Sequence, residues 1–308
     1  MNRPSRASAV APASVGNVGV GFDILGHVIA GPADRVTVER LDAPEVRIVG
    51  VEGVVTGLPL EPERNTAGRA LMALRSRLGL GHGFAVRIEK GIPLGSGMGG
   101  SAASCVAALV AANALLERPA PIDVLYPCAM AGESAASGAE HGDNVGPMLL
   151  GGLALATHDR LVPIPVPDGL TCVLVHPHHV LETRTARAVL QRPFELPRFV
   201  EQSAHLALVL AGCFRNDLES IRAGLKDVLV EPLRAPLVPG FAQVKAAAME
   251  HGALGASISG GGPSVFAWCT SERAEGIAAA MEQAFRSVSL ASDVWISPVA
   301  APGARVVQ

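Results

Sequence analysis

The sequence predicts a fold of mixed α-helices and β-strands, arranged as one large domain or two medium-sized ones. Segments 34–40 and 84–93 alternate apolar with charged side chains, which is typical of antiparallel sheets with one face in water. Segment 65–80 instead has leucine and alanine at helical spacing. The chain has 308 residues, of which 49% are hydrophobic. Single cores stop growing at roughly 250–300 residues, so one large or two medium domains are expected.

The first part of the chain is predicted to contain short strands and two helices. The strands are expected at 34–40, 45–50 and 84–93. The helix at 65–80 is preceded by Asn65, a residue type that caps helix N-termini well. A second helix is expected at 101–117, directly after a glycine-rich stretch. Its apolar residues lie on every side, so we expect it to be buried.

A proline-rich segment follows, which we interpret as the domain boundary. The segment, HDRLVPIPVPDGL, covers residues 158–170, and we divide the chain into domains 1–160 and 161–308. Further elements are expected on both sides of this boundary. Strands are predicted at 148–157 and 170–177, helices around 200–212 and 240–251, and a hairpin at 255–268 that turns at Gly260–Gly262.

Composition argues against several classes of protein. The net charge of -3 does not suggest a nucleic-acid binder, although small anionic ligands need only local positive charge. The five cysteines are scattered and never in CxxC spacing, which favours reduced, buried thiols over disulfides or a zinc site. No signal peptide is recognisable, and the longest apolar run, 102–116, is shorter than the roughly 20 residues of a membrane span. We therefore expect a cytoplasmic protein without a nucleic-acid or membrane partner.

The stretch GIPLGSGMGGSAAS, residues 91–104, is the strongest local signal. Gly95, Gly97 and Gly100 formally match the dinucleotide pattern GxGxxG, but the preceding strand alternates with charges and does not run straight into the turn. The lysine of a Walker A motif is absent. A cradle of backbone amides at a helix N-terminus would still bind phosphate, and the hydroxyl of a serine such as Ser101 could ligand magnesium. A tight turn that needs glycine is the alternative.

Two further segments concentrate polar side chains among small residues. Asn17 and Asp23 lie in the glycine-rich segment 11–26, where they could border a ligand or form Asx turns. Segment 131–147 contains Glu133, Glu140, His141, Asp143 and Asn144. Carboxylates suit magnesium, which prefers oxygen ligands, whereas a solvated loop with local caps is the alternative.

Three of these segments together resemble the motifs of the GHMP kinases. Residues 93–104 are similar to the phosphate-binding motif of that family, PASVGNVGVGFDILG at 12–26 to its N-terminal motif, and SGGGPSVFA at 259–267 to its C-terminal motif. The motifs follow the family's order and span nearly the whole chain. Among these kinases, the homoserine kinases are the branch that the finer details resemble: HGDNVGP, LETRTARAVL and EPLRAPLVPGF.

The resemblance implies an α+β fold of two domains. Residues 1–160 would form an ATP-binding domain like domain 2 of ribosomal protein S5, and residues 161–308 a ferredoxin-like domain. It also implies ATP and Mg²⁺ as cofactors, L-homoserine as the substrate phosphorylated on its side-chain hydroxyl, a place in threonine biosynthesis, and a homodimer.

The resemblance also assigns the substrate-binding residues. Homoserine is a zwitterion, so its site needs an acceptor for the ammonium group and cationic donors for the carboxylate. Asp23 matches the family's aspartate for the ammonium group. Arg187 and Arg234 match its arginines for the carboxylate. Asn17 and Asn144 match its substrate-binding asparagines.

The nucleotide and metal residues are assigned in the same way. Glu133 matches the magnesium-binding glutamate, and Ser101 the serine that faces metal and phosphates. Asn65 matches a position near the nucleotide. The residues expected to surround the triphosphate are Pro93, Gly95, Ser96, Gly97, Gly99, Gly100 and Ser101. Many relatives have a serine where this chain has Gly100, and we expect the helix amides and Ser101 to make the consequences modest.

Catalysis of phosphoryl transfer consists mostly of positioning and electrostatic stabilisation. The resemblance implies that Asn144 orients the substrate hydroxyl, with Glu133 and Ser101 completing the catalytic set. Asp143 is the rival as a general base, although we expect it to brace the loop. We expect His141 to border the substrate, and HPHH at 176–179 to be a loop without a metal.

Two other functions are compatible with the same motifs. One is a kinase for another small molecule, such as a mevalonate-type substrate, but that substrate has no ammonium group to match Asp23. The other is a nucleotide-binding protein without catalysis, against which the retention of Glu133 and Ser101 argues.

Overall fold

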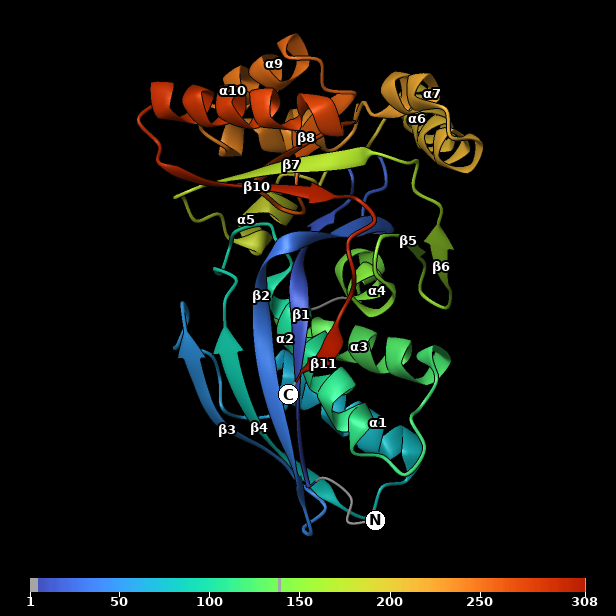
Figure 1. The fold of residues 1–308 in the computed structure, drawn as a ribbon, viewed down its shortest axis with the longest axis vertical. Coiled ribbons are helices and arrows are strands. Elements are labelled where there is room, and N and C mark those ends of the chain that lie inside the picture. The colour runs from blue at the N-terminus through green and yellow to red at the C-terminus, as the bar shows by residue number, and fades with distance from the viewer. Residues whose placement is uncertain (1–4, 138–139, 308) are drawn as a thin grey trace.

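The computed structural model describes residues 5–137 and 140–307 and has two sheets, each with helices packed against it (Figure 1). The first four residues, on which the expected absence of a leader partly rests, lie outside the described residues. The mixed helix–strand fold predicted from the sequence is confirmed. The larger sheet carries α1 to α4 on one side, and the smaller sheet carries α9 and α10 (Figure 1).

The larger sheet is mostly antiparallel. Its central path runs β11–β1–β2–β4–β3, and β5 pairs with both β2 and β6. Only the β3–β4 pair is parallel among the pairs described. The strands are β1 (Arg6–Gly16), β2 (Leu25–Leu41), β3 (Val46–Gly53), β4 (Gly83–Lys90), β5 (Leu153–Ala156), β6 (Leu161–Ile164) and β11 (Arg305–Val307).

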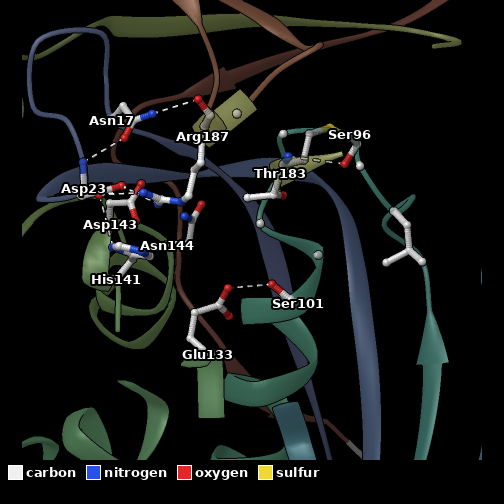
Figure 2. Close-up of a pocket in the computed structure, with 18 of the residues that line it drawn as sticks. Asn17, Asp23, Ser96, Ser101, Glu133, His141, Asp143, Asn144, Thr183 and Arg187 are labelled. Atoms are coloured by element: carbon white, nitrogen blue, oxygen red, sulfur yellow. Dashed lines mark hydrogen bonds and ion pairs between the residues drawn. The ribbon is translucent and has the colours of Figure 1, made fainter. Parts of the chain in front are cut away.

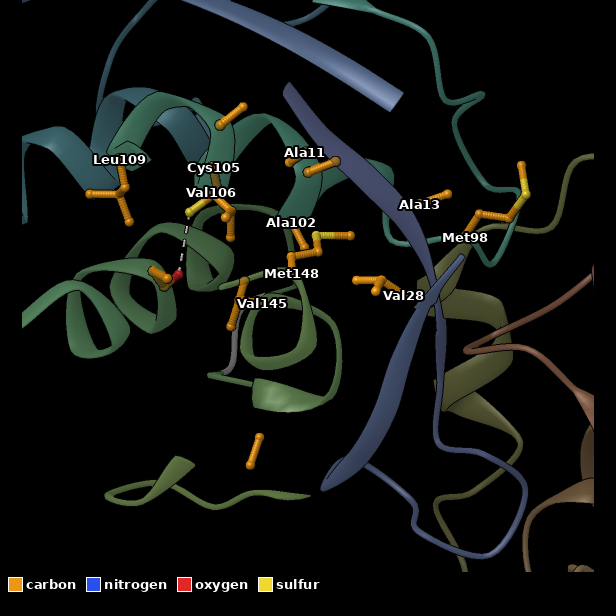
Figure 3. Close-up of a cluster of buried hydrophobic side chains, with 14 of the residues drawn as sticks. Ala11, Ala13, Val28, Met98, Ala102, Cys105, Val106, Leu109, Val145 and Met148 are labelled. Carbon is orange, nitrogen blue, oxygen red and sulfur yellow. Dashed lines mark hydrogen bonds between the residues drawn. The ribbon is translucent and has the colours of Figure 1, made fainter. Parts of the chain in front are cut away.

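Four helices build the core beneath this sheet: α1 (Thr66–Leu78), α2 (Gly100–Ala114), α3 (Ile122–Ser137) and α4 (Gly142–Leu150). α2 is buried on almost every side, as its all-round apolar sequence predicted. In Figure 3, Ala102 and Val106 of α2 lie beside Val145 and Met148 of α4. Alanine-rich faces permit this close approach, and it holds the first turn of α2 rigidly at the upper end of the core.

The smaller sheet has the strand order β10–β7–β9–β8, and every pair in it is antiparallel. Its strands are β7 (Leu170–Pro177), β8 (Gly255–Ile258), β9 (Val265–Thr270) and β10 (Ser292–Pro298). In chain order this is the 4-1-3-2 arrangement of a ferredoxin-like domain, as predicted. The associated helices are α5 (Thr183–Ala188), α6 (Leu196–Arg215), α7 (Leu218–Gly224), α8 (Glu231–Arg234), α9 (Phe241–Glu250) and α10 (Ala274–Ser287), with 3-10 turns at Ala235–Leu237 and Ser271–Arg273.

One predicted element is wrong in its first half. Segment 148–157 was expected to be a strand throughout, but Met148–Leu150 form the last turn of α4 and only Leu153–Ala156 form β5. Gly151 and Gly152, both with positive φ (82° and 59°), make the break between them. The apolar run looked continuous because both halves are buried in the same core, and burial alone does not distinguish a helix from a strand.

The domain boundary at 160/161 stays a prediction. The proline-rich segment contains β6, which pairs with β5 of the larger sheet, and β11 returns to pair with β1. The two sheets are also joined directly, since Trp268 Nε1 of β9 donates to His27 Nε2 of β2 at 3.1 Å. Within the described residues, no helix is long and apolar enough to cross a membrane.

Candidate active site

A cavity of about 220 Å³ lies where loops of the two sheets meet (Figure 2). Its walls come from the glycine-rich loop, the first turns of α2 and α4, α3, α5 and the turn between β8 and β9. Except for Asn65, every residue predicted for the site lines this cavity. They are Asn17, Asp23, Pro93, Gly95, Ser96, Gly97, Gly99, Gly100, Ser101, Glu133, Asn144, Arg187 and Arg234.

The glycine-rich loop reaches α2 through a backbone that only glycine adopts easily. Gly95, Gly97 and Gly99 have φ of 61°, 74° and 69°. At Gly97 a Cβ atom would lie 2.4 Å from the carbonyl oxygen of Ser259, so no side chain fits there. Because α2 begins at Gly100, the unpaired amides of its first turn and the positive end of its dipole lie at the cavity. These are the features of a phosphate-binding helix N-terminus.

Serine hydroxyls hold the loop in this shape. Ser96 Oγ donates to the carbonyl oxygen of Pro93 at 2.7 Å and accepts from the amide of Met98. Ser259 Oγ donates to the carbonyl oxygen of Gly97 at 2.7 Å, and Ser264 Oγ to that of Ser96 at 2.6 Å. The hydroxyl of Ser96 therefore braces the loop from within, and the turn after β8 supports it from the smaller sheet.

Ser101 and Glu133 form a polar pair on the cavity floor. Ser101 Oγ donates to Glu133 Oε1 at 2.8 Å across the gap between α2 and α3 (Figure 2). Burial, followed by the nearby Asp143, raises the pKa of Glu133 to about 7, although the Ser101 hydrogen bond, Lys90 and Arg187 oppose that rise. A cation beside this carboxylate would relieve the cost of burying its charge.

The oxygen atoms of this pair fit magnesium. No cluster of three or more His, Cys, Asp or Glu side chains suited to a metal occurs among residues 5–137 and 140–307. Magnesium keeps several waters and is commonly held by one or two carboxylates together with substrate phosphates. Glu133 supplies one carboxylate and Ser101 one hydroxyl beside the glycine-rich loop, which matches this way of binding magnesium. A site in which the protein supplies every ligand is a different arrangement.

The opposite end of the cavity carries an ion pair between a loop and a helix that are far apart in sequence. Arg187 of α5 makes two hydrogen bonds to Asp23, at 2.9 Å to Oδ1 and 3.2 Å to Oδ2. His141 Nδ1 lies 3.3 Å from Asp23 Oδ2. Figure 2 shows Arg187 and His141 converging on Asp23. This arrangement places a carboxylate and a cationic guanidinium side by side, where one small ligand of both charges could contact them.

Asn17 fixes the loop that carries Asp23. Its Oδ1 accepts from the backbone amide of Asp23 at 2.9 Å, and its Nδ2 donates to the carbonyl oxygen of Gly260 at 2.9 Å. Both Asn17 and Asp23 have positive φ (69° and 63°), as the alternative of local turns suggested. The amide of Asn17 thus has partners within the protein, and in this structure its role is to join the Asp23 loop to the turn after β8.

A second arginine lies beside the ion pair. Arg234 is 3% exposed and donates to the carbonyl oxygens of Ala186, from Nε at 3.0 Å, and Gly260, from Nη1 at 2.9 Å. Its guanidinium and that of Arg187 both lie over the ring of Phe22, at 5.2 Å and 5.7 Å. Burial and the neighbouring Arg187 lower its pKa to about 10, which still leaves it charged at neutral pH.

The first turn of α4 brings Asp143 and Asn144 to the cavity. Asn144 Oδ1 accepts from Ser14 Oγ at 2.7 Å, so its NH₂ group is left to donate to a ligand. Asp143 is 3% exposed, and burial together with Asp23 raises its pKa to about 7. It accepts a hydrogen bond from the backbone of Asn17, which ties α4 to the Asp23 loop.

Asn65 occupies a different position from the other predicted residues. Its side chain caps α1, accepting from the amides of Ala67 and Gly68, and it donates to the carbonyl oxygen of Pro59. It lines a neighbouring cavity of about 490 Å³ that shares Leu94 and Ser101 with the first. The predicted N-cap is confirmed, and the second cavity adjoins the first along this shared wall.

Some residues of the cavity were not predicted, and the histidine-rich segment at 176–179 differs in part from its prediction. Thr183, at the start of α5, and the turn glycines Gly260 and Gly261 line the cavity, and no local pattern singled out Thr183. The HPHH segment was expected to be a loop, but His176 and Pro177 are the last residues of β7, because both pair with β10. His176 is buried and hydrogen bonds to Ser264, and His178 lies 3.0 Å from Asp293. His141 lines the cavity as expected.

Comparisons with known proteins agree with this geometry. The family model of the GHMP kinase N-terminal domain matches residues 65–152, and that of the GHMP kinase C-terminal domain matches residues 209–287. A homoserine kinase of Xanthomonas campestris pv. campestris (strain B100) is 59% identical, over 98% of this chain and 94% of that protein. The chain belongs to the homoserine kinase family of GHMP kinases.

Solved structures place the kinase in the same family. The crystal structure of homoserine kinase from Cytophaga hutchinsonii aligns with a TM-score of 0.95 and 40% identity, covering 100% of this chain and 99% of that one. An L. major mevalonate kinase in complex with R-mevalonate aligns with a TM-score of 0.70 at 16% identity, over 98% of this chain and 100% of that one. The second likeness shows only that the fold is common to kinases with different substrates.

Proposed function

We propose that this kinase transfers the γ-phosphoryl group of ATP to the side-chain hydroxyl of L-homoserine, which gives O-phospho-L-homoserine for threonine biosynthesis. One observation supports this most directly: a single cavity combines a phosphate-binding helix N-terminus with an acid and two arginines. ATP phosphates suit the amides of α2 at one end. At the other end, Asp23, Arg187 and Arg234 match the two charges of an amino acid.

The Asp23–Arg187 ion pair explains how a zwitterion would be selected. A bound amino acid presents its ammonium group to Asp23 and its carboxylate to Arg187 and Arg234, so each partner of the ion pair exchanges one opposite charge for another. A hydroxy acid has no ammonium group, so its binding would take Arg187 from Asp23 without giving the Asp23 carboxylate another cation. A mevalonate-type substrate is therefore disfavoured at this site.

The nucleotide end of the cavity supplies positioning and charge stabilisation. The residues that would hold Mg²⁺ are Ser101 and Glu133, and the ion, when bound, would neutralise charge on the transferring phosphates. The amides of Gly97 to Ser101 would hold the phosphates, and Asn65 would lie near the nucleoside part of ATP. Each of these groups would be held in place by the glycine-rich loop or by α1, α2 or α3, so that little rearrangement is needed when ATP binds.

Asn144 orients the attacking hydroxyl in this proposal. Its Oδ1 is engaged by Ser14, so its NH₂ group can donate to the substrate hydroxyl oxygen. Asp143 is buried behind the end of β1, where a Cβ atom on Gly16 would lie 2.5 Å from Asp143 Oδ2. That packing supports a bracing role for Asp143 and direct transfer of the phosphoryl group without a dedicated base.

The cellular setting is also part of the proposal. All five cysteines are free and buried, which suits a reducing compartment. A cytoplasmic homodimer is the form we propose, in keeping with the expectation from the sequence.

An ADP-release assay tests the reaction. ADP should form with L-homoserine and not with mevalonate, galactose or shikimate. As a matched control, 4-hydroxybutanoate keeps the carboxylate and hydroxyl of homoserine but lacks its ammonium group, and it should be a poor substrate. Equal turnover of homoserine and 4-hydroxybutanoate would contradict the role of Asp23, and turnover of mevalonate alone would favour the other kinase function.

A further inference from the structure

The exposed surface of α6 carries large apolar side chains near both ends of the helix, beside a few charged and polar residues. Its buried side consists of Gln202, Val209, Gly212 and Cys213. The large apolar side chains that are exposed on this helix include Leu196 (72% exposed), Phe199 (57%), Val200 (59%) and Phe214 (64%). A helix on the surface of a soluble domain normally carries polar residues on the side that faces away from the core. This helix therefore presents a second apolar face, and such faces mark interaction sites.

The order of side chains on this face is symmetric about one residue. Going along the helix, Val200 is followed at helical spacing by Ala204, Ala207 and Ala211, and then by Phe214, and all five are exposed. Ala207 lies seven residues from Val200 and seven residues from Phe214. Large side chains thus flank a centre of small ones, and the pattern reads the same in shape from either end.

We propose that this face binds a second copy of the chain, with the two α6 helices antiparallel and crossing at Ala207. A two-fold axis between the helices then places Val200 of each copy opposite the partner's Phe214. The alanines at the centre let the helix axes approach closely, at the short end of the 8–10 Å range for packed helices. A two-fold interface of this kind uses the same patch on both copies, which a self-complementary face requires.

The charges beside the stripe support the antiparallel direction. Glu201 and Arg215 each follow one residue after Val200 and Phe214, so they lie on the same flank of the stripe. An antiparallel pair brings Glu201 near the partner's Arg215 twice, whereas in a parallel pair these two residues would lie 14 positions apart along the helices. Glu201 pairs with Arg198 at 3.1 Å within its own helix, and that exposed pair contributes little and can be exchanged.

The dimensions of the face also suit a dimer. α6 has 20 residues, which corresponds to about 30 Å of helix. An interface of standard size covers roughly 800 Å² on each partner, a patch about 30 Å across. Beside the helix lies an apolar groove of about 550 Å³, with Phe194, Phe199 and Leu206 among its walls. The partner's Phe214 would lie next to this groove, because Phe199 adjoins Val200.

Disulfide trapping at the proposed axis tests the arrangement. In Ala207→Cys, the two introduced thiols meet only if the helices cross at that residue, so oxidation should give a covalent dimer on non-reducing gels. The native cysteines are all buried and contribute little background. Val54→Cys, at a site 63% exposed on the larger sheet's edge, is the matched control and should stay uncrosslinked. Val200→Cys mixed with Phe214→Cys should crosslink, and neither should do so alone.

Sedimentation equilibrium of the full chain supplies a second readout. Val200→Glu with Phe214→Glu should raise the dimer dissociation constant at least tenfold. Glu201→Arg or Arg215→Glu should each weaken the dimer, and the two together should restore it. The proposal is overturned if the wild-type chain is a monomer, if Ala207→Cys crosslinks no more than Val54→Cys, or if the glutamate variants remain dimeric. None of these readouts uses the enzyme assay, so they stand apart from the proposed reaction.

Discussion

Lys90 forms an ion pair with Asp34 directly beside the glycine-rich loop, and both side chains are buried. Lys90 Nζ also donates to Ser104 Oγ at 3.0 Å and to the carbonyl oxygen of Gly100, the first residue of α2. Asp34 Oδ1 accepts from the amides of Gly91, at 3.0 Å, and Ile92, at 3.2 Å. The pair therefore joins the residues that enter the loop to the residues that leave it.

Removing one partner of this ion pair should damage both folding and ATP binding. Lys90→Met leaves the Asp34 carboxylate buried without its cation, and such a loss typically costs about 3–5 kcal/mol of the free energy of unfolding. Among active molecules, KM for ATP should rise more than KM for homoserine, because the loop shape changes. Urea denaturation and steady-state kinetics measure the two effects.

The matched control for that prediction is a double variant. Asp34→Leu combined with Lys90→Met removes both charges and should recover part of the lost stability, since no buried charge is left unpaired. If Lys90→Met were as stable as the wild type, the ion pair would have no role in holding the loop.

The sequence predicted the parts of this fold that depend on local patterns. Asn65 caps α1 as predicted, and α2 is as buried as its all-round apolar residues indicated. β1 was missed because most of it is buried on both faces, so its residues do not alternate with charges. Segment 148–157 was half wrong because its two halves share one core.

In the candidate site as well, local motifs indicated individual residues but not the contacts between them. Local motifs indicated Asp23 and the phosphate loop, but no local pattern shows that Asp23 contacts Arg187, 164 positions later in the chain. The sequence also does not show that the side chains of Ser96 and Asn17 hydrogen bond to backbone atoms of the protein. Those contacts follow from tertiary packing.

Substitution of Arg187 should weaken homoserine binding and spare ATP. Arg187→Leu removes a charged hydrogen-bond donor from the wall of the cavity, which is worth about 1.5–3 kcal/mol, or roughly 10- to 100-fold in KM for homoserine. KM for ATP should change little. Arg184→Leu, at an exposed position in the same helix, is the control and should leave both constants unchanged. Loss of ATP affinity with unchanged homoserine affinity would reverse the assignment of Arg187.

Substitution of Glu133 should change the magnesium dependence of the rate more than KM for ATP or for homoserine. Glu133→Gln keeps the shape of the side chain and a possible hydrogen bond with Ser101 but removes the charge. Turnover should fall by at least tenfold, and the magnesium concentration for half-maximal rate should rise. A titration of activity with magnesium measures this, and Ser134→Ala, on the next residue of α3, is the control. An unchanged magnesium dependence would exclude Glu133 as a ligand.

Replacement of Asp143 distinguishes two roles for this residue, that of a general base and that of a structural support for the neighbouring loop. A general base contributes typically 10²- to 10⁴-fold to the rate, so Asp143→Asn should lower kcat by that much if it takes the proton. We expect a smaller loss, less than about tenfold, because Asp143 is packed behind β1. The thermal stability of the same variant should change, since Asp143 accepts from the backbone of Asn17. A loss of 10² or more in kcat with unchanged stability would identify the base.

His27 predicts how acid acts on the junction between the two sheets. Burial lowers its pKa from 6.5 to about 4, and its neutral ring accepts from Trp268 while hydrogen bonding to the carbonyl oxygen of Val28. Between pH 6.5 and 4 the unfolded chain binds a proton on this histidine that the folded chain does not. The free energy of unfolding should therefore fall as pH drops through this window, by up to about 1.4 kcal/mol per pH unit.

Other groups titrate in the same range, so the measurement must be a difference. His176, whose pKa is also lowered to about 4, adds to the effect of His27, whereas the raised pKa values of Glu133 and Asp143 act in the opposite direction. His27→Gln cannot titrate but keeps an oxygen that can accept from Trp268. Subtracting the urea-derived stability of this variant from that of the wild type at each pH isolates His27. The difference in the free energy of unfolding should be nearly constant above pH 7 and should shift against the wild type as pH falls toward 4. A difference that does not change with pH would mean that His27 is protonated in the folded kinase as readily as in the unfolded chain.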